Sequence, residues 1–234
     1  MAGSTPGSPG VSGGELILYR TFGTITQKDG HLSTPRRGRS KPEQQPSATE
    51  PNVSGRDRLI PTLARVFRRY GYEAASLSVL SSETGLNRSS LYHFFPGGKE
   101  EMAMAVLSFA EEFVREDLMA TLTAPSPQKA QLERFIGKLH DYYEGGGLGC
   151  LYSTLTLHDC PEAVGARVAA LTEQWIAAIA SHLASQRIKD ARLRAEKFMR
   201  LLQGGLVVAL ATQDPARFEA ALDDLKPVLS GGRS

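Results

Sequence analysis

The 234 residues include 41% hydrophobic and 22% charged side chains, proportions typical of globular proteins and not of disordered or membrane proteins. The longest apolar run, residues 206 to 211, is far shorter than the roughly 20 residues that cross a bilayer, and the residues after Met1 do not resemble a signal peptide, so we expect a cytoplasmic protein. The formal net charge of +2 neither favours nor excludes nucleic acid, but the excess of basic residues lies in the first 100 positions.

Residues 1 to 55 are rich in Gly, Ser, Pro and Thr, a composition that cannot bury a core, and we expect a disordered leader. Within it, Glu15 to Gln27 is either a short strand or a stretch of no structural consequence. The basic run Arg36 to Pro42 resembles an AT-hook core, with Ser40 in place of the usual proline. This run is therefore either an accessory arm for the minor groove or a charged tail.

A helical period begins at Arg56 and ends at Gly71. Its apolar face contains Leu59, Leu63, Val66, Phe67 and Tyr70. Ser54 and Asp57 have the spacing of a capping box, but Pro61 would then lie inside the helix at a cost of about 3 kcal/mol. We therefore expect the regular helix to begin near Ile60 or to be kinked there.

Residues 76 to 95 predict two short helices around one glycine. Leu77, Val79 and Leu80 form the inward face of the first helix, Gly85 permits a left-handed turn, and Leu86 fills the corner. Asn87 can cap the second helix, which then points Leu91 and either Phe94 or Phe95 inward. The pattern indicates a helix-turn-helix.

The outward face of the second helix suits the major groove of DNA. It carries Arg88, Ser89, Ser90, Tyr92 and His93. Arg can bind guanine through two hydrogen bonds and Ser can read base edges, whereas Tyr92, His93 and the following Lys99 can hold phosphates. The alternative is a helical hairpin with a solvated polar face.

Further helices are expected over residues 99–122, 127–144, 151–157, 161–185, 190–211 and 215–229. No β-rich run follows residue 55, so the folded part is predicted to be all-α. Gly204 and Gly205 lie inside one of these helices, which indicates close approach of another backbone. Cys150 and Cys160 lack metal-ligand spacing and are expected to be free thiols, with a regulatory disulfide as the alternative. We expect no metal and no cofactor.

The stretch from Arg56 to Val106 resembles the DNA-binding domain of the TetR/AcrR family. The resemblance rests on Gly71-Tyr72, Gly85-Leu86, Leu91-Tyr92-His93-Phe94-Phe95 and Lys99-Glu100, each at the family's spacing. Phe95 to Glu101 and Gly149-Cys150-Leu151 are further similar to the LmrA-like branch of multidrug and secondary-metabolite regulators.

The resemblance implies a helix-turn-helix domain over residues 56–100 and a helical effector-binding and dimerisation domain over 101–234. It places Ser76 and Ser78 near the groove, together with Asn87 to Ser90. The implied pocket for a small hydrophobic or aromatic effector includes Phe109, Phe113, Phe135, Leu139, His140, Tyr143, Cys150, Tyr152 and Trp175. The implied dimer interface includes Phe198, Leu202, Gly205, Leu206, Leu210, Phe218 and Leu222. A two-fold dimer would bind a palindromic operator as a repressor, and the effector would release it.

Two other classes of protein compete with this interpretation. One is a helical adaptor that binds a protein partner and has lost DNA recognition. The other is an enzyme using His158, Asp159 and Cys160, but three adjacent residues cannot all converge on one substrate atom. We therefore expect no enzymatic activity.

Overall fold

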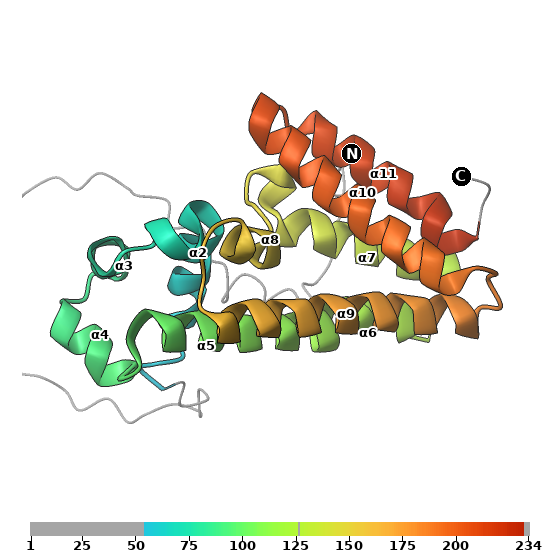
Figure 1. Ribbon diagram of the computed structural model, residues 1–234. Helices are drawn as coiled ribbons and strands as arrows, with labels where there is room; N and C mark the ends of the chain where they lie inside the picture. The colour runs from blue at the N-terminus through green and yellow to red at the C-terminus, as the bar shows by residue number, and fades with distance from the viewer. Residues whose placement is uncertain (1–53, 126, 232–234) are drawn as a thin grey trace, which may run out of the picture. The chain divides into compact units, whose positions relative to one another are not determined.

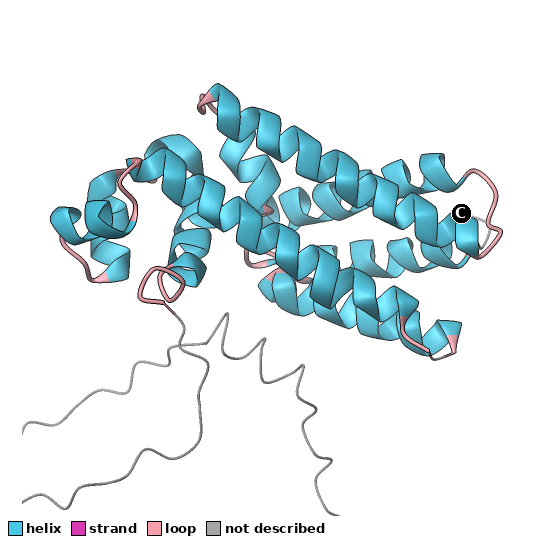
Figure 2. Ribbon diagram, turned by 90° about the horizontal axis from the view of Figure 1, so that it is seen from below, coloured by secondary structure: helices cyan, strands magenta, loops and turns pink. Residues whose placement is uncertain are grey.

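The computed structural model describes residues 54–125 and 127–231, and from Gly55 onward the chain forms one compact unit (Figure 1). The two features predicted within the leader, Glu15 to Gln27 and Arg36 to Pro42, lie outside the described residues. Every regular element of the described residues is helical, as the view coloured by secondary structure shows (Figure 2). The all-α prediction is confirmed.

The described α-helices vary in length from the five residues of α6 to the 24 residues of α9. The first four are α2 (Ile60–Ala74), α3 (Leu77–Thr84), α4 (Arg88–Phe94) and α5 (Gly98–Glu112). A π-helical segment, η1 (Phe113–Leu118), joins α5 to α6 (Met119–Thr123), and α7 (Gln128–Tyr142) ends in the 3-10 turn η2 (Glu144–Gly146). The chain finishes with α8 (Leu151–Thr156), α9 (Glu162–Ser185), α10 (Ala191–Thr212) and α11 (Ala216–Ser230). Helix α2 packs on α3, α5 and α8, while α10 packs on α9 and α11.

Helix α2 begins where the sequence predicted. Its first residue is Ile60, and Pro61 falls in the first turn, where no backbone donor is needed. The regular dihedral angles stop at Gly71, whose φ of 71° and ψ of −176° make a kink before the last turn. A Cβ at Gly71 would lie 2.8 Å from the carbonyl oxygen of Thr154, so this glycine also lets α2 approach the backbone of α8.

The long helix expected over residues 99–122 is present but changes its winding. The five-residue hydrogen-bond spacing of η1 interrupts it at Phe113, next to the buried ring of Tyr142. Such π-helical turns are rare and occur mostly at functional sites. The sequence pattern could not distinguish this turn from ordinary α-helix.

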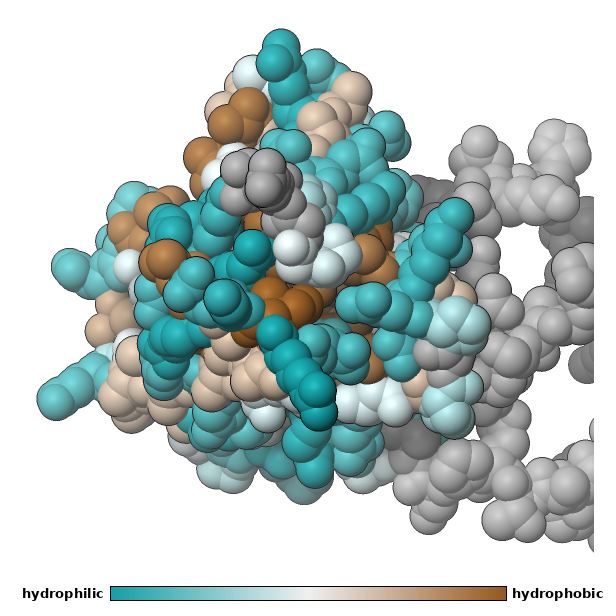
Figure 3. Space-filling view, turned by 90° about the vertical axis from the view of Figure 1, so that its right-hand side faces the viewer, coloured by the Kyte–Doolittle hydropathy of each residue, from teal (hydrophilic) through white to brown (hydrophobic). Residues whose placement is uncertain are grey.

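The core runs along the inner faces of the helices. Its fully buried large side chains include Phe67, Phe95, Phe135, Tyr143, Phe198 and Phe218. The end of the bundle where α9 is followed by α10 carries mostly hydrophilic residues, with hydrophobic ones visible between them (Figure 3). Among the described residues, no helix has an apolar stretch long enough to span a bilayer.

The structure contradicts the prediction that most of the seven dimer residues are available to a partner. Phe198, Leu202, Leu206, Phe218 and Leu222 are at most 4% exposed because α10 and α11 pack against each other and against the rest of the chain. Gly205 faces α11 as well, since a Cβ there would lie 2.2 Å from the Cβ of Ala221. Only Leu210, at 42%, is exposed. The other six positions belong to the chain's own core and are unavailable to a partner.

Candidate nucleic-acid interface and effector region

The helix-turn-helix is held by local capping hydrogen bonds. The Oγ of Ser76 accepts a hydrogen bond from the backbone N–H of Val79 at 3.3 Å, which caps α3, and Gly85 ends α3 with a φ of 68°. The Oδ1 of Asn87 accepts from the N–H of Ser90 at 2.8 Å and caps α4. Because each cap satisfies a donor that the helix cannot, the short helices begin at fixed residues.

Helix α4 presents its polar side to solvent. Arg88, Ser89, Tyr92 and His93 are exposed and Ser90 is half-buried, whereas Leu91 is fully buried. Between the two candidate inward aromatics, Phe95 is fully buried and Phe94 is half-buried against the ring of His93, with 5.4 Å between ring centroids. The predicted outward set is therefore the set that the structure leaves accessible, with only Ser90 partly covered.

Helices α3 and α4 are joined across this surface by a direct contact. The Nη2 of Arg88 donates to the Oγ of Ser78 at 2.5 Å, and Ser78 is itself exposed. Both residues line an open cleft with Ser76 and Tyr92. The guanidinium of Arg88 is thereby oriented before any base or phosphate is present, and this bond uses only one of its five N–H donors.

Lys99 lines the same cleft as Arg88 and Tyr92, but its ammonium group already has hydrogen-bond partners. Its Nζ donates to the carbonyl oxygens of Tyr72 at 3.0 Å and of Glu73 at 3.4 Å, and lies 4.3 Å from the centroid of the Tyr72 ring. Partial burial lowers the pKa of Lys99, although the nearby Glu73 opposes this shift. A phosphate would have to compete with these carbonyl oxygens for the ammonium group. In this structure the hydrogen bonds of Lys99 connect the end of α2 to α5.

The entry to α2 is also tied to α5. The guanidinium of Arg56 donates to Oε1 of Glu101 at 2.9 Å and lies 4.9 Å from the centroid of the Phe95 ring. The sequence did not identify this contact. It places the start of the DNA-binding domain against the helix that leads into the rest of the bundle.

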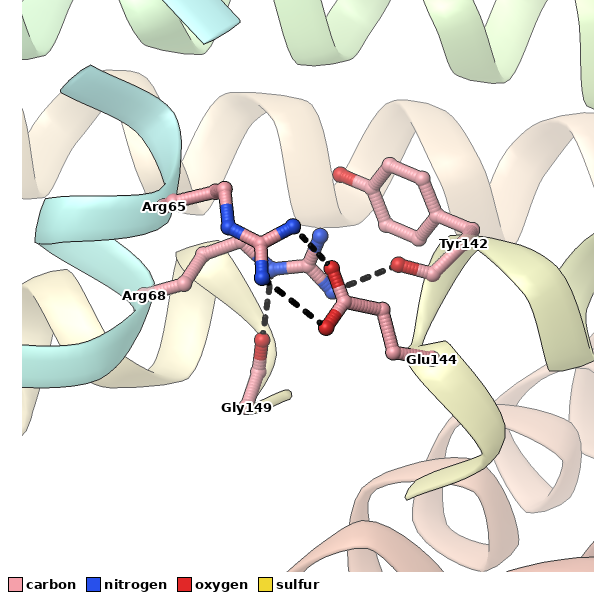
Figure 4. A network of polar contacts seen from close by, with 5 residues as sticks. All are labelled: Arg65, Arg68, Tyr142, Glu144 and Gly149. Atoms are coloured by element: carbon pink, nitrogen blue, oxygen red, sulfur yellow. Dashed lines mark hydrogen bonds and ion pairs between the residues drawn. The ribbon is translucent and has the colours of Figure 1, made fainter. Parts of the chain in front are cut away.

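Two arginines of α2 reach the connection between α7 and α8 (Figure 4). Arg65 forms a two-point ion pair with Glu144, at 2.5 and 3.2 Å. Arg68 is buried: its Nε donates to the carbonyl oxygen of Gly149 at 2.8 Å and its Nη2 to that of Tyr142 at 2.9 Å. The first helix of the helix-turn-helix is thus hydrogen-bonded to residues 142–149.

Most of the predicted effector-pocket residues belong to two sets of buried aromatic contacts. The centroids of contacting rings are 4.5 to 6.3 Å apart. One series of contacts runs from Phe113 through Tyr142 and Tyr143 to Phe218. The other runs from Tyr152 through Trp175 and Phe198 to Phe135. Tyr143 also donates to the Sγ of Cys150 at 3.7 Å. Leu139 is buried and Phe109 is half-buried. The sequence did not assign Tyr142 and Arg68 to this region, and it assigned Phe198 to the dimer interface.

His140 is the exception among these predicted residues. Its imidazole is 44% exposed, and its Nδ1 lies 3.2 Å from the carboxylate of the adjacent Asp141. It is near Gly145, at the C-terminal end of α7, and its recorded contacts are with this turn. The helical period carries residue 140 away from the buried face that holds Phe135 and Leu139, so His140 is a surface residue.

The alternative site at residues 158–160 shows no catalytic arrangement. His158 and Asp159 are exposed, and Cys160 and Cys150 are free thiols. Within the part of the chain that the structure describes, no group of three or more His, Cys, Asp or Glu side chains could hold a metal ion.

Comparisons with known proteins agree with this arrangement. Residues 59–106 match the model for bacterial regulatory proteins of the tetR family. The uncharacterized HTH-type transcriptional regulator YxaF of Bacillus subtilis is 25% identical over 68% of this chain and 86% of its own length. The HTH-type transcriptional regulator LmrA of the same organism is 22% identical over 68% of this chain and 88% of its own length.

The fold is also that of solved regulators. A cysteine mutant of the TetR-family regulator CifR, crystallised with 26-bp operator DNA, superposes with a TM-score of 0.57. It is 22% identical in sequence, and the match covers 80% of this chain and 98% of that one. The helix-turn-helix and the family match coincide in the chain. Residues 59–106 are therefore a helix-turn-helix domain of the tetR family, and over about two thirds of its length the chain is similar to helix-turn-helix transcriptional regulators.

Proposed function

We propose that the protein is a repressor that binds a palindromic operator as a two-fold dimer and leaves it when a small hydrophobic or aromatic effector binds. Residues 56–100 would contact DNA, and residues 101–234 would bind the effector and the second copy. The observation that carries the proposal is the exposed side of α4, where Arg88 is oriented by Ser78 at 2.5 Å. CifR, whose fold this chain shares, binds double-stranded operator DNA in its own complex.

The DNA contacts would divide by chemistry. Arg88 is the candidate for two hydrogen bonds to a guanine, and Ser89 and Ser90 for contacts to base edges or backbone. Ser76, Ser78, Asn87, Tyr92 and His93 would hold phosphates at the edges of the groove, where contacts fix orientation but carry no base preference. Lys99 would support this surface indirectly, through its hydrogen bonds to the carbonyl groups of Tyr72 and Glu73.

The dimer would use the outer side of α10. Leu193 is 60%, Val207 61% and Val208 45% exposed, and these join Leu210 as large hydrophobic residues left open to solvent on this helix. A Cβ at Gly204, which precedes Val207 by three residues and Val208 by four, would meet no atom within 4 Å. A partner helix can therefore approach closely there. Such a dimer would present two α4 helices about 34 to 36 Å apart, one turn of DNA.

The effector site would be the aromatic region around Trp175. This side chain is 3% exposed, yet no group in the described part of the chain accepts a hydrogen bond from its indole Nε1. A buried donor of this kind is unfavourable unless something accepts from it. An effector that favoured a dimer with wrongly spaced recognition helices would lower operator affinity, because a ligand shifts an equilibrium only through its different affinities for the two states.

Selection of bound genomic fragments, followed by gel-shift titration with the recovered operator, tests the function. Arg88→Ala should weaken binding about 5- to 150-fold, the equivalent of about 1–3 kcal/mol for one guanine contact. Arg115→Ala is the matched control, since this arginine is 70% exposed but lies on η1. Recovery of no specific fragment would favour the adaptor alternative, and equal affinities of both variants would remove Arg88 from the interface.

A further inference from the structure

Arg68 is a buried cation without a carboxylate partner. Its side chain is 2% exposed, and among the described residues no Asp or Glu forms an ion pair with it. Two donors are used by the carbonyl oxygens of Gly149 and Tyr142, but Nη1 has no hydrogen-bond partner. An arginine cannot lose its proton to escape this environment, so the charge and the unpaired donor are both retained at a cost.

The surroundings of Arg68 are aromatic. Its guanidinium carbon lies 4.4 Å from the ring centroid of Tyr142 and 5.2 Å from that of Tyr143. The Tyr142 ring in turn stacks on Phe113 with centroids 4.5 Å apart and planes 9° from parallel. Arg68 is therefore the charged edge of the aromatic set formed by Phe113, Tyr142 and Tyr143.

Two buried donors beside these rings have no hydrogen-bond partner among the described residues, Nη1 of Arg68 and Nε1 of Trp175, while the unpaired acceptor Oε1 of Gln203 lies on α10. Tyr152 relates to both sets of rings, because its ring contacts Trp175 with centroids 6.3 Å apart and its pKa is raised by burial and by the nearby Tyr142. A region with surplus donors and one buried positive charge is complementary to a ligand with acceptor atoms and a negative charge.

We infer that the effector is an aromatic carboxylate whose carboxylate group binds Nη1 of Arg68. This inference rests on the proposed function, because it names the chemical class that the effector site would accept. The ligand's aromatic ring would pack against Tyr142 beside the π-helical turn η1, where the ring of Phe113 now stacks, so that ring would have to move aside on binding. Since Arg68 belongs to α2, the ligand's charge would act directly on the first helix of the DNA-binding domain.

Isothermal titration calorimetry with matched probes tests the inference. Benzoate and 2-naphthoate are each compared with their uncharged carboxamides, which keep the ring and remove the negative charge. Trp175 is the chain's only tryptophan, so a change in its emission on binding reports on the same region. We expect at least one carboxylate to bind the wild type about ten- to a hundredfold more tightly than its amide, the range of a charge-assisted hydrogen bond.

Substitutions then show which arginine recognises the carboxylate of the ligand. Arg68→Met should bring the two affinities to within about twofold, while Arg65→Met is the matched control. Arg65 lies one turn away on α2 and pairs with Glu144 at the surface, so the control should keep the preference for the carboxylate. Binding of no probe, equal affinities for acid and amide, or a preference that survives Arg68→Met would each overturn the inference. If Arg68→Met does not fold, the comparison of acid and amide on the wild type still decides.

Fluorescence anisotropy of labelled operator separates this inference from the function on which it rests. Release of the operator by the carboxylates supports both the repressor function and the anionic effector. Release by carboxamides equally well overturns the anionic effector but leaves the repressor intact. Failure of the wild type to bind any genomic fragment overturns the repressor itself, whatever the probes do.

Discussion

Replacing Gly205 with alanine should destabilise the protein, although alanine favours helix. Gly205 lies in the middle of α10, and an added Cβ would be 2.2 Å from the Cβ of Ala221 on α11 and 3.8 Å from the ring of Phe218. Carbon atoms in ordinary contact are about 3.5–4.0 Å apart, so the two helices would have to separate by more than 1 Å. The neighbouring Gly204 offers a matched comparison, because a Cβ there meets nothing within 4 Å.

The magnitude follows from two opposing effects. Alanine is favoured over glycine by about 1 kcal/mol inside a helix. Overpacking a well-packed core costs about 1–3 kcal/mol, and a contact between two backbone-attached carbons lies at the upper end because neither can rotate away. We therefore expect Gly205→Ala to lose about 2 kcal/mol of unfolding free energy and Gly204→Ala to gain up to about 1 kcal/mol.

Thermal unfolding followed by circular dichroism measures the difference. A loss of about 2 kcal/mol should lower the Tm of Gly205→Ala by about 4–8 °C in a domain of this size. Because the clash lies within one chain, the deficit should be the same at two well-separated protein concentrations. A deficit that changes with concentration would return Gly205 to the dimer interface. Equal Tm values for the two variants would refute the intrachain contact.

Three further predictions concern capping, assembly and pH. Asn87→Ala should lower the free energy of unfolding by about 1 kcal/mol in urea titration, because the cap to the N–H of Ser90 is lost, whereas Asn87→Ser should restore most of it. Val207→Asp should shift the protein toward monomer in sedimentation velocity, whereas the same change at Ser181, which is exposed on α9, should not. A Val207→Asp protein that remains dimeric would exclude the outer side of α10 as the dimer interface. Burial lowers the pKa of His182, so the unfolded chain takes up a proton at higher pH than the folded chain does. The free energy of unfolding should therefore fall as the pH drops below about 6.5, the pKa of the unfolded histidine, and level off below the pKa of the folded one. A pH profile of stability that is unchanged by His182→Gln would contradict this assignment.

The DNA-binding domain could be predicted from sequence because its signals are local. Gly85, Asn87 and Pro61 each act on backbone groups within a few residues, and the structure has each in the predicted conformation. Helix starts, the turn and the outward side of α4 follow from such signals without knowledge of the tertiary packing. The choice of Phe95 over Phe94 as the buried ring required the position of Arg56, which comes from a distant contact.

Assignments that depend on packing between distant helices were less predictable. Helix α10 is apolar on two sides, with Phe198, Leu202 and Leu206 on one and Val207 and Val208 on the other. Periodicity identifies apolar sides but does not say which of them meets α11 and which remains open to a second chain. Most of the residues predicted for a dimer interface are therefore buried within the chain itself.

Arg68 was missed for a related reason. An arginine in a helix is normally predicted to lie at the surface, because charged side chains are seldom fully buried. Yet Arg68 follows the buried Ala64 by four residues and precedes the buried Gly71 by three, which places it on the inner side of α2. A charged residue at a core position of a helix is the sequence signal that could have identified it.

Helix α2 contacts both the helix-turn-helix and residues 142–154, so it could transmit a structural change from the proposed effector site to the proposed DNA-binding surface. On one side, the carbonyl oxygens of Tyr72 and Glu73 near its C-terminal end accept hydrogen bonds from Lys99, and α2 also packs on α3. On the other, Arg65, Arg68 and the backbone of Gly71 contact Glu144, Gly149 and Thr154. These contacts occur on successive turns of one short helix, and hydrogen bonds and close backbone approaches tolerate little displacement. Movement of residues 142–154 therefore requires α2 either to lose these contacts or to follow, and if α2 follows, α3 and α4 move with it because α3 packs on both.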